Sequence, residues 1–381
     1  MKKRQANIEL LKIVNMLMVV GIHYIRESGS LLTLEAERLT ARHAVAMFFE
    51  VLFIVMIDAY VFISGYYGIN GKFKVSKLIS YQCRLWFYTL LIPLVLMLFG
   101  VPTLMDSEGI YGLFKYIFPI GNSHYWFMTA YFYMMLFMPF INHAVKTLSK
   151  KQLILVTACF LVIFCGVKSI VPLRFSMDNG GYDLLWLLCV YLLAACMRMY
   201  GGKLEAFFDK HALKIYLGSA TASFLIIIGA WFLSRKTDGV AYLFMMPIHH
   251  NFIFCLIGAM GLFYTFRKMR IKEGKGADVI RRLATYSLGV YLLHEHLDLR
   301  TKWCPALTDF LKPVLGEGVL FFLVGLLLSV AVMFAAGVAL DFVREKLFHF
   351  VYKRIAKTKP VKAVYQLDGI FAEKEGEAGG K

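Results

Sequence analysis

The chain has 381 residues, of which 59% are hydrophobic, and its mean hydropathy is +0.63. A soluble domain is roughly 45 to 50% apolar, so this composition excludes a water-soluble globular fold and predicts an integral protein of the lipid bilayer. The formal net charge of +17 does not indicate a nucleic-acid partner, because Lys and Arg lie in short loops between apolar runs rather than on one soluble surface.

The N-terminal segment, MKKRQANIELLKIVNMLMVVGIHYI, has a basic start followed by an apolar run, which is the layout of a signal peptide. Glu9 and Lys12 interrupt the apolar run, however, and no A-x-A cleavage site follows it. We therefore predict an uncleaved first transmembrane helix.

Apolar runs of bilayer length continue along the chain and predict an all-α, polytopic bundle of about ten transmembrane helices. The runs near 251 and 284 are shorter than the roughly 20 residues of a full crossing, so we expect them to extend into their flanks, tilt or re-enter. An aromatic stretch at 110–120 fits a helix at the membrane interface. The predicted spans are 8–25, 44–66, 79–99, 125–142, 152–171, 182–199, 213–233, 251–266, 284–298 and 318–343.

Lys and Arg gather in alternate loops, and in membrane proteins the cytoplasmic loops carry the positive excess. With the N-terminus in the cytoplasm, the inner segments hold most of these residues, including the basic segments 267–282 and 344–362. The even number of spans agrees, so both termini are predicted to be cytoplasmic. We divide the chain into a membrane domain, 1–345, and a basic tail, 346–381, that becomes disordered because it has little to bury.

The first helix carries ionisable residues at membrane depth, where a charge costs at least about 2.5 to 3.5 kcal/mol and needs a partner, a cavity or a function. Lys12 and His23 are eleven residues apart, which places them on one face and about 16 Å apart along the axis. Glu9 precedes Lys12 by three residues, a spacing that allows an ion pair. This stripe indicates a polar tunnel with His23 as a general base. Alternatively, Lys12 snorkels to the headgroups and His23 lies in the outer interface.

Further ionisable residues lie in later spans. Glu50 and Asp58 are eight residues, and so about 80°, apart in the second span, which predicts that at least one faces the bundle. Arg84, early in the third span, could meet phosphate groups from the cytoplasmic side or snorkel. His124 and Trp126 stand at the start of the fourth span, where Trp is typical of the interfacial belt.

The ninth span ends in a polar cluster, in which the four-residue spacing of His294 and Asp298 allows a hydrogen-bonded pair. We predict no metal site, because no further ligand is evident beside this cluster and the seven cysteines offer neither a CxxC pair nor a zinc spacing. The sequence has no GxSxG, Walker or HExxH motif. Covalent serine catalysis is therefore unsupported, whereas direct attack by a hydroxyl that a histidine deprotonates stays open.

Several segments together resemble the membrane acyltransferase 3 family, the bacterial O-acyltransferases that modify cell-surface carbohydrates. The most specific element is a basic residue, ten intervening positions and a histidine in the first helix, met here by Lys12 and His23. Glu9 resembles the acidic residue that opens this helix. The resemblance covers about residues 7–345, and its other matching positions are Ser64 with Gly65, His124 with Trp126, and Tyr291 with His294.

The resemblance implies a stand-alone O-acyltransferase of the bacterial cytoplasmic (inner) membrane. It implies that acetyl-CoA, or another acyl-CoA, is the co-substrate, bound from the cytoplasm, and that the acyl group passes to a carbohydrate hydroxyl near the outer face. A diffusible thioester donor requires no metal. In this scheme His23 is the general base and Glu9 orients or charges the site. The oligomeric state is left open.

One position departs from the family pattern. The family often has an Arg, two residues and another Arg near the start of the third helix, tied to binding of the acyl donor; this chain offers Lys74 and Lys77, then Arg84. These three residues and Lys12 are the candidates for holding the donor phosphates. The candidates for substrate binding are Asp58, His124, Trp126 and His294.

Two other functions are alternatives to an acyltransferase. A transporter or flippase of a small molecule or glycolipid explains the helices and the polar stripe equally well and needs no catalytic base. A structural or sensory membrane protein leaves the buried acids and His23 unexplained.

Overall fold

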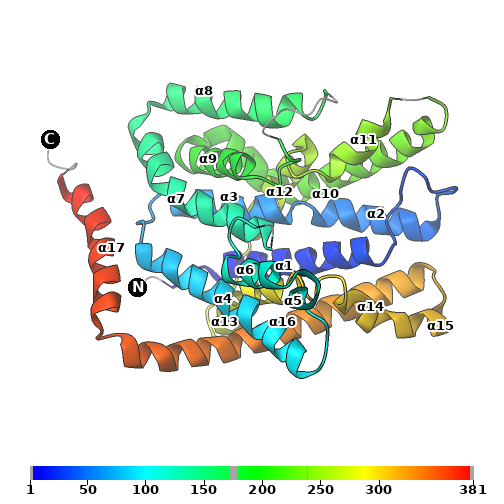
Figure 1. The fold of residues 1–381 in the computed structure, drawn as a ribbon. Helices are drawn as coiled ribbons and strands as arrows, with labels where there is room; N and C mark the ends of the chain where they lie inside the picture. The colour runs from blue at the N-terminus through cyan, green and yellow to red at the C-terminus, as the bar shows by residue number, and fades with distance from the viewer. Residues whose placement is uncertain (1–2, 123, 172–177, 238, 378–381) are drawn as a thin grey trace.

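The computed structural model describes residues 3–122, 124–171, 178–237 and 239–377, and within these ranges the regular secondary-structure elements are all helices. The longer helices run roughly parallel in one bundle, and the short ones lie in the connections (Figure 1). The first half of the chain contains α1 (Ala6–Glu27), α2 (Ala41–Phe53), α3 (Met56–Gly68), α4 (Val75–Leu98), α5 (Leu104–Glu108), α6 (Ile110–Ile117), α7 (Trp126–Thr147), α8 (Lys150–Leu161) and the π-helical turn η1 (Val162–Val167).

The second half of the chain begins with two long helices that are nearly continuous in sequence. Its elements are α9 (Leu184–Tyr200), α10 (Gly202–Ser234), α11 (Ala241–Met245), η2 (Met246–Ile248), α12 (Ile253–Arg267), α13 (Lys275–His294), α14 (Trp303–Thr308), η3 (Asp309–Leu311), α15 (Lys312–Leu315), α16 (Val319–Ile355) and α17 (Lys359–Glu377).

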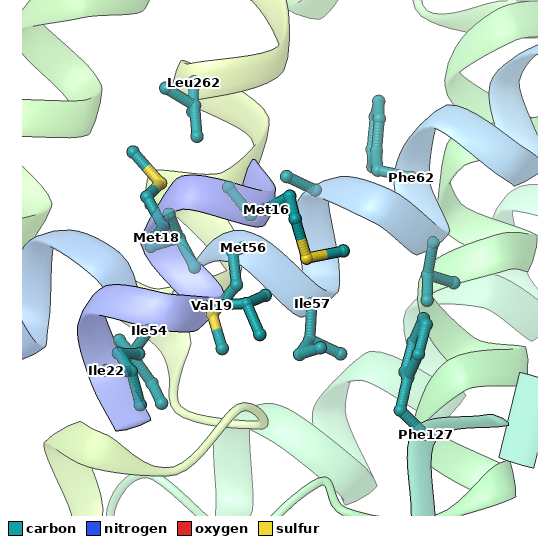
Figure 2. Packing of buried hydrophobic residues seen from close by; sticks show 14 of the residues in the cluster. Met16, Met18, Val19, Ile22, Ile54, Met56, Ile57, Phe62, Phe127 and Leu262 are labelled. Atoms are coloured by element: carbon teal, nitrogen blue, oxygen red, sulfur yellow. The ribbon is translucent and has the colours of Figure 1, made fainter. Parts of the chain in front are cut away.

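Helix α1 is the central element of the bundle and packs against α2, α3, α12, α13 and α16. Its apolar side chains interdigitate with those of the neighbouring helices, as Met16 and Val19 do beside Ile57 of α3 (Figure 2). Most of α1 is buried. Of its ionisable residues, Glu9 is buried, whereas Lys12, His23 and Arg26 are partly buried.

Seven stretches of the described chain are long and apolar enough to cross a bilayer, so this is a multi-pass membrane protein. All ten predicted spans fall on helices, but α7, α9 and α13 are not among these seven stretches. Ten crossings therefore stay a prediction. The stretches are Ala6–Glu27, Ala41–Gly68, Val75–Leu98, Lys150–Val167, Gly202–Ser234, Ala241–Arg267 and Val319–Ile355.

The helix boundaries follow local side-chain chemistry. The hydroxyl of Thr40 accepts a hydrogen bond from the His43 backbone N–H at the start of α2, and Ser149 caps α8 in the same way through Gln152. The predicted span 44–66 is interrupted between α2 and α3 at Ile54, whose carbonyl oxygen lies 3.7 Å from Cys255 Sγ of α12. The short span predicted at 251–266 is extended on its N-terminal side by α11 and η2.

The start of α1 and the whole of α17 lie at the same end of the bundle (Figure 1). This arrangement agrees with an even number of crossings, while the side of the membrane on which this end lies stays a prediction. We refer below to this end as the terminal end, and to the opposite end, which contains α14 and α15, as the distal end.

The C-terminal tail differs from the sequence-based expectation. Helix α16 continues through the expected boundary at 345, and residues 359–377 form α17 where we expected disorder. The tail is ordered because α17 packs on α4, where Asp368 accepts hydrogen bonds from the backbone N–H of Ser76 at 3.0 Å and from its hydroxyl at 2.6 Å. Residues 378–381 lie outside the described ranges. Figure 1 shows α17 lying across the terminal end of the bundle.

Helices α3 and α9 approach closely at Gly65. A Cβ atom added to Gly65 would overlap the Tyr191 carbonyl oxygen and lie 2.8 Å from the Cβ of Ala194. Small residues at such crossings let two helix backbones pack in direct contact inside a membrane. A side chain at position 65 would therefore push α9 away from α3.

We predict that Gly65→Ala destabilises the protein by about 1 to 3 kcal/mol, the usual cost of overpacking a tight interior. The measurement is thermal unfolding of the purified protein in detergent. Gly218→Ala in α10 is the matched control, because an added Cβ there meets no atom within 4 Å and should leave stability unchanged or slightly higher. Equal unfolding temperatures for the two variants would contradict the close α3–α9 contact.

Candidate active site

A cavity of about 1590 Å³ penetrates the bundle between α1, α3, α4, α7 and α13. Its volume exceeds the roughly 300 to 1,000 Å³ typical of pockets for drug-sized ligands, so it suits a long ligand. Seven Lys and Arg side chains line it, whereas no Asp or Glu does so among the residues that the structure describes. These cations are Arg4, Lys12, Lys72, Lys74, Lys77, Arg84 and Lys146.

Basic residues and apolar residues occupy different parts of this cavity. The start of α4, with Lys74 at its N-cap and Lys77 in its first turn, lies at the terminal end of the bundle, as does the last turn of α7, which carries Lys146. Further along α1 the lining is apolar and includes Met16 and Val19. The cavity thus has a cationic mouth and an apolar interior, which suits an anionic ligand with an uncharged tail.

One face of α1 runs along the cavity. Lys12, Met16 and Val19 line it at spacings of four and three residues, and the next position on this face is His23. His23 itself lies one helical turn, about 6 Å, beyond Val19. The stripe inferred from the sequence therefore extends from the cavity toward the distal end.

The lysine at the start of this stripe is held by an ion pair. Glu9 is 2% exposed, and its two carboxylate oxygens lie 2.8 Å from Lys12 Nζ and 3.0 Å from Arg4 Nη1. Because these partners are both on the terminal side, Glu9 does not reach His23. Glu9 thus pairs with Lys12 and Arg4 at the start of the stripe.

A second charge cluster fixes the wall formed by α4 and α16. Asp341 is fully buried, and its carboxylate oxygens lie 2.7 Å from Arg84 Nη2 and 2.6 Å from Arg344 Nε, while the Tyr88 hydroxyl donates to it at 2.9 Å. Arg84 also lines the cavity. Its guanidinium is therefore tethered by Asp341 and less available to a ligand than a lysine on the surrounding loops.

A histidine pair occupies the far end of the α1 stripe. His23 Nδ1 lies 2.9 Å from His294 Nε2, and a carboxylate oxygen of Glu295 lies 3.3 Å from the same His23 nitrogen. The His23 and Glu295 side chains are 21% and 15% exposed, whereas His294 is fully buried. The end of α13 thus meets α1 at the site that the sequence assigned to His23.

The hydrogen bonds of this pair define which nitrogen carries a proton. His294 Nδ1 lies 2.6 Å from the Val290 carbonyl oxygen, which can only accept, so Nδ1 is protonated and Nε2 is an acceptor. His23 Nδ1–H then donates to His294 Nε2 and toward Glu295. The lone pair of neutral His23 is consequently on Nε2, which has no hydrogen-bond partner among the described residues. This atom can accept a proton, and Glu295 can stabilise the resulting imidazolium.

An ion pair missed by the sequence reasoning lies one turn beyond His23. Arg26 donates to one oxygen of the fully buried Glu50 through Nη2 at 2.7 Å and through Nε at 3.0 Å. The Tyr182 hydroxyl accepts from Arg26 at 3.3 Å, and the Tyr182 ring contacts that of Trp126 with 4.8 Å between centroids. Glu50 therefore faces the bundle, and Trp126 is adjacent to the site rather than to lipid alone.

Two predicted substrate-binding residues lie elsewhere. Asp58 is fully buried and accepts a hydrogen bond from Trp186 Nε1 at 2.8 Å, so its carboxylate faces α9 instead of the cavity. His124 is 2% exposed and packs against His296, with ring centroids 4.7 Å apart. Burial lowers the pKa of His124 to about 3, which keeps the ring neutral at physiological pH. Neither residue lines the cavity among the described residues, and their part in substrate binding stays a prediction.

The hydrogen-bonded pair proposed between His294 and Asp298 does not form. Helix α13 ends at His294, so the four-residue spacing no longer places the two side chains on one face. Asp298 instead accepts from the Tyr116 hydroxyl and the Leu104 backbone N–H, each at 2.7 Å. Because α13 ends at His294, Glu295 can turn toward His23. The sequence indicates this contact only through the high density of ionisable residues at 294–298.

Fold and site together define a multi-pass membrane protein in which a cation-lined cavity leads toward a histidine pair. Residues 5–338 match the family model described as an acyltransferase domain. The chain therefore belongs to the acyltransferase 3 family and is a membrane acyltransferase. Searches of curated proteins and of solved structures give no match.

We predict that Asp341→Ala lowers stability by about 3 to 5 kcal/mol, because it leaves Arg84 and Arg344 buried without their shared partner. Thermal unfolding in detergent measures this effect. Asp309→Ala is the control, since Asp309 is 57% exposed and pairs with Lys312 at the surface, where a pair contributes at most about 1 kcal/mol. A loss of similar size in both variants would argue against a structural Asp341 cluster.

Proposed function

We propose that this acyltransferase takes an acyl group, typically acetyl, from a cytoplasmic acyl-CoA and transfers it to a hydroxyl of a cell-surface or lipid-linked carbohydrate. The observation that carries the proposal is the continuity of one face of α1, on which Lys12, Met16 and Val19 line the cavity and His23 follows. Family membership favours this enzyme over the transporter or flippase alternative.

The cavity supports an acyl-CoA as donor because its two chemical zones match the two parts of that molecule. The phosphates of CoA are anionic and would bind at the cationic mouth, near Lys74, Lys77 and Lys12. The uncharged arm that ends in the thioester would lie along Met16 and Val19. This pose directs the thioester toward His23.

The same pose predicts how the protein is oriented in the membrane. Acyl-CoA is made in the cytoplasm, so the cationic mouth and the two termini would face the cytoplasm of a bacterial inner membrane, in agreement with the positive-inside distribution. The distal end, with His23 and Trp126, would then face the compartment that holds the carbohydrate acceptor.

The reaction needs one general base. His23 Nε2 removes the proton from the acceptor hydroxyl, and the oxygen of that hydroxyl attacks the thioester carbonyl carbon. The C–S bond then breaks, CoA leaves as the thiolate, and the proton on His23 is passed to the sulfur. His294 holds the ring of His23 in the required tautomer, and Glu295 stabilises its imidazolium form. All three act without a covalent enzyme intermediate.

We predict that His23→Ala lowers kcat by roughly 10² to 10⁴-fold, the usual contribution of a general base, while acyl-CoA binding is retained. The measurement is release of CoA from acetyl-CoA by the purified protein in detergent, with candidate glycan acceptors, beside binding of the donor. His349→Ala is the control, because His349 is exposed near the end of α16. Full activity of the His23 variant would remove this residue from the mechanism.

We also predict that the double variant Lys74→Gln, Lys77→Gln raises the KM for acetyl-CoA at least about 10-fold, because each charge-assisted contact to a phosphate contributes about 1.5 to 3 kcal/mol. kcat should change less than about twofold, since these residues lie far from the bond that breaks. Lys210→Gln serves as a control at an exposed position outside the cavity. An unchanged KM would place the donor elsewhere.

A further inference from the structure

Three side chains at the far end of the α1 stripe offer metal-ligating atoms at one point. His23, His294 and Glu295 each present one nitrogen or oxygen atom, and these atoms lie within 4.8 Å of one another. Two of the separations are 2.9 Å, between His23 Nδ1 and His294 Nε2, and 3.3 Å, between His23 Nδ1 and Glu295 Oε1. Two imidazoles and one carboxylate are a common ligand set of zinc.

Two of the three separations are close to those of a zinc site, and the third is at most 4.8 Å. Zinc binds His nitrogen and carboxylate oxygen at about 2.0 to 2.2 Å, so neighbouring ligands in a tetrahedron are about 3.3 to 3.5 Å apart. The His23–Glu295 separation already has this value, and the two histidines need to move apart by only about 0.5 Å. Small side-chain rotations would therefore convert the hydrogen-bonded cluster into three metal ligands.

The surroundings favour such an ion. The Val290 carbonyl accepts from Nδ1 of His294, which is the outer-shell contact that orients a ligating histidine and leaves its Nε2 free for a metal. His23 and Glu295 are partly exposed, so an ion has access and water can take the fourth position. The sequence did not indicate this site because its ligands come from α1 and from the end of α13, which are far apart in the chain.

We propose that His23, His294 and Glu295 form a site for one divalent transition-metal ion of the zinc class, and that an ion bound there inhibits acyl transfer. The inhibition rests on the proposed function of His23. A metal on Nδ1 places the ring proton on Nε2, so the lone pair that would accept the proton of the acceptor hydroxyl is lost. No bond is made or broken apart from the metal coordination and this shift of the ring proton.

Binding is tested first, without donor or acceptor. The full chain, purified in detergent with a tag that contains no histidine and stripped with a chelator, is dialysed against Zn²⁺ and its metal content is measured. We expect one Zn²⁺ per chain, an affinity at least about 10-fold weaker in Glu295→Gln and in His294→Gln, and unchanged binding in His349→Ala. A 100-fold excess of Mg²⁺ should not compete, because Mg²⁺ prefers oxygen ligands.

Comparable thermal unfolding of the variants without metal shows that they are folded. Equal Zn²⁺ affinity of the wild type and of both ligand variants would overturn the metal site. Replacement of Zn²⁺ by Co²⁺ gives a second readout, since a tetrahedral Co²⁺ spectrum in the wild type that is lost in Glu295→Gln would support these ligands.

Inhibition is tested separately with the acyl-transfer assay. We expect the wild type to lose at least about 10-fold in rate when the measured site is filled with Zn²⁺, and to recover when the chelator is added. If Zn²⁺ binds but the rate is unchanged, the inhibitory part of the proposal is overturned. If Zn²⁺ does not bind while His23→Ala still abolishes transfer, the metal site is overturned and the proposed function stands.

Discussion

The need to pair every ionisable group inside an apolar bundle is the constraint on which this structure depends. Helix α1 provides partners for its ionisable groups at both ends. Glu9 pairs with Lys12 and Arg4 on the terminal side, and His23 lies beside His294 and Glu295 on the distal side. Between these ends the helix is mainly apolar, with the buried Asn15 as its one polar side chain, and packs against its neighbours. The polar groups are thus concentrated at the two places where a ligand could enter or react, and the cavity lining at Met16 and Val19 lies between them.

Some charged residues of the surrounding helices fix the helices to one another, and others line the cavity. Asp341 ties Arg84 of α4 to Arg344 of α16, and Glu50 ties α2 to Arg26 of α1. In both clusters a fully buried carboxylate pairs with one or two arginines of a neighbouring helix or turn, so these charges stabilise helix positions. The cavity lining differs, because among the described residues it holds seven Lys and Arg side chains and no carboxylate, so its potential stays positive toward an anion even though Glu9 pairs with Lys12 and Arg4.

The sequence was sufficient for features that depend on one helix alone. Hydropathy located the helices, and the eleven-residue spacing of Lys12 and His23 predicted their common face, because helix geometry fixes both from local sequence. Contacts between helices could not be predicted from local sequence. Whether Asp58 faces the cavity or Trp186 depends on how α3 is rotated against α9, and the meeting of His23 with Glu295 depends on where α13 ends. The order of the C-terminal tail likewise arises from packing of α17 on α4, which local composition does not report.

A single uninterrupted helix connects the cavity mouth to the histidine pair, and this makes the region between Lys12 and His23 sensitive to changes in length. Inserting one residue there would shift His23 by about 1.5 Å and rotate it by about 100°, away from His294. Insertion of a full turn would restore the direction but move the ring by about 5.4 Å along the axis. The number of residues between Lys12 and His23 is therefore fixed by the distance from the cavity mouth to the histidine pair.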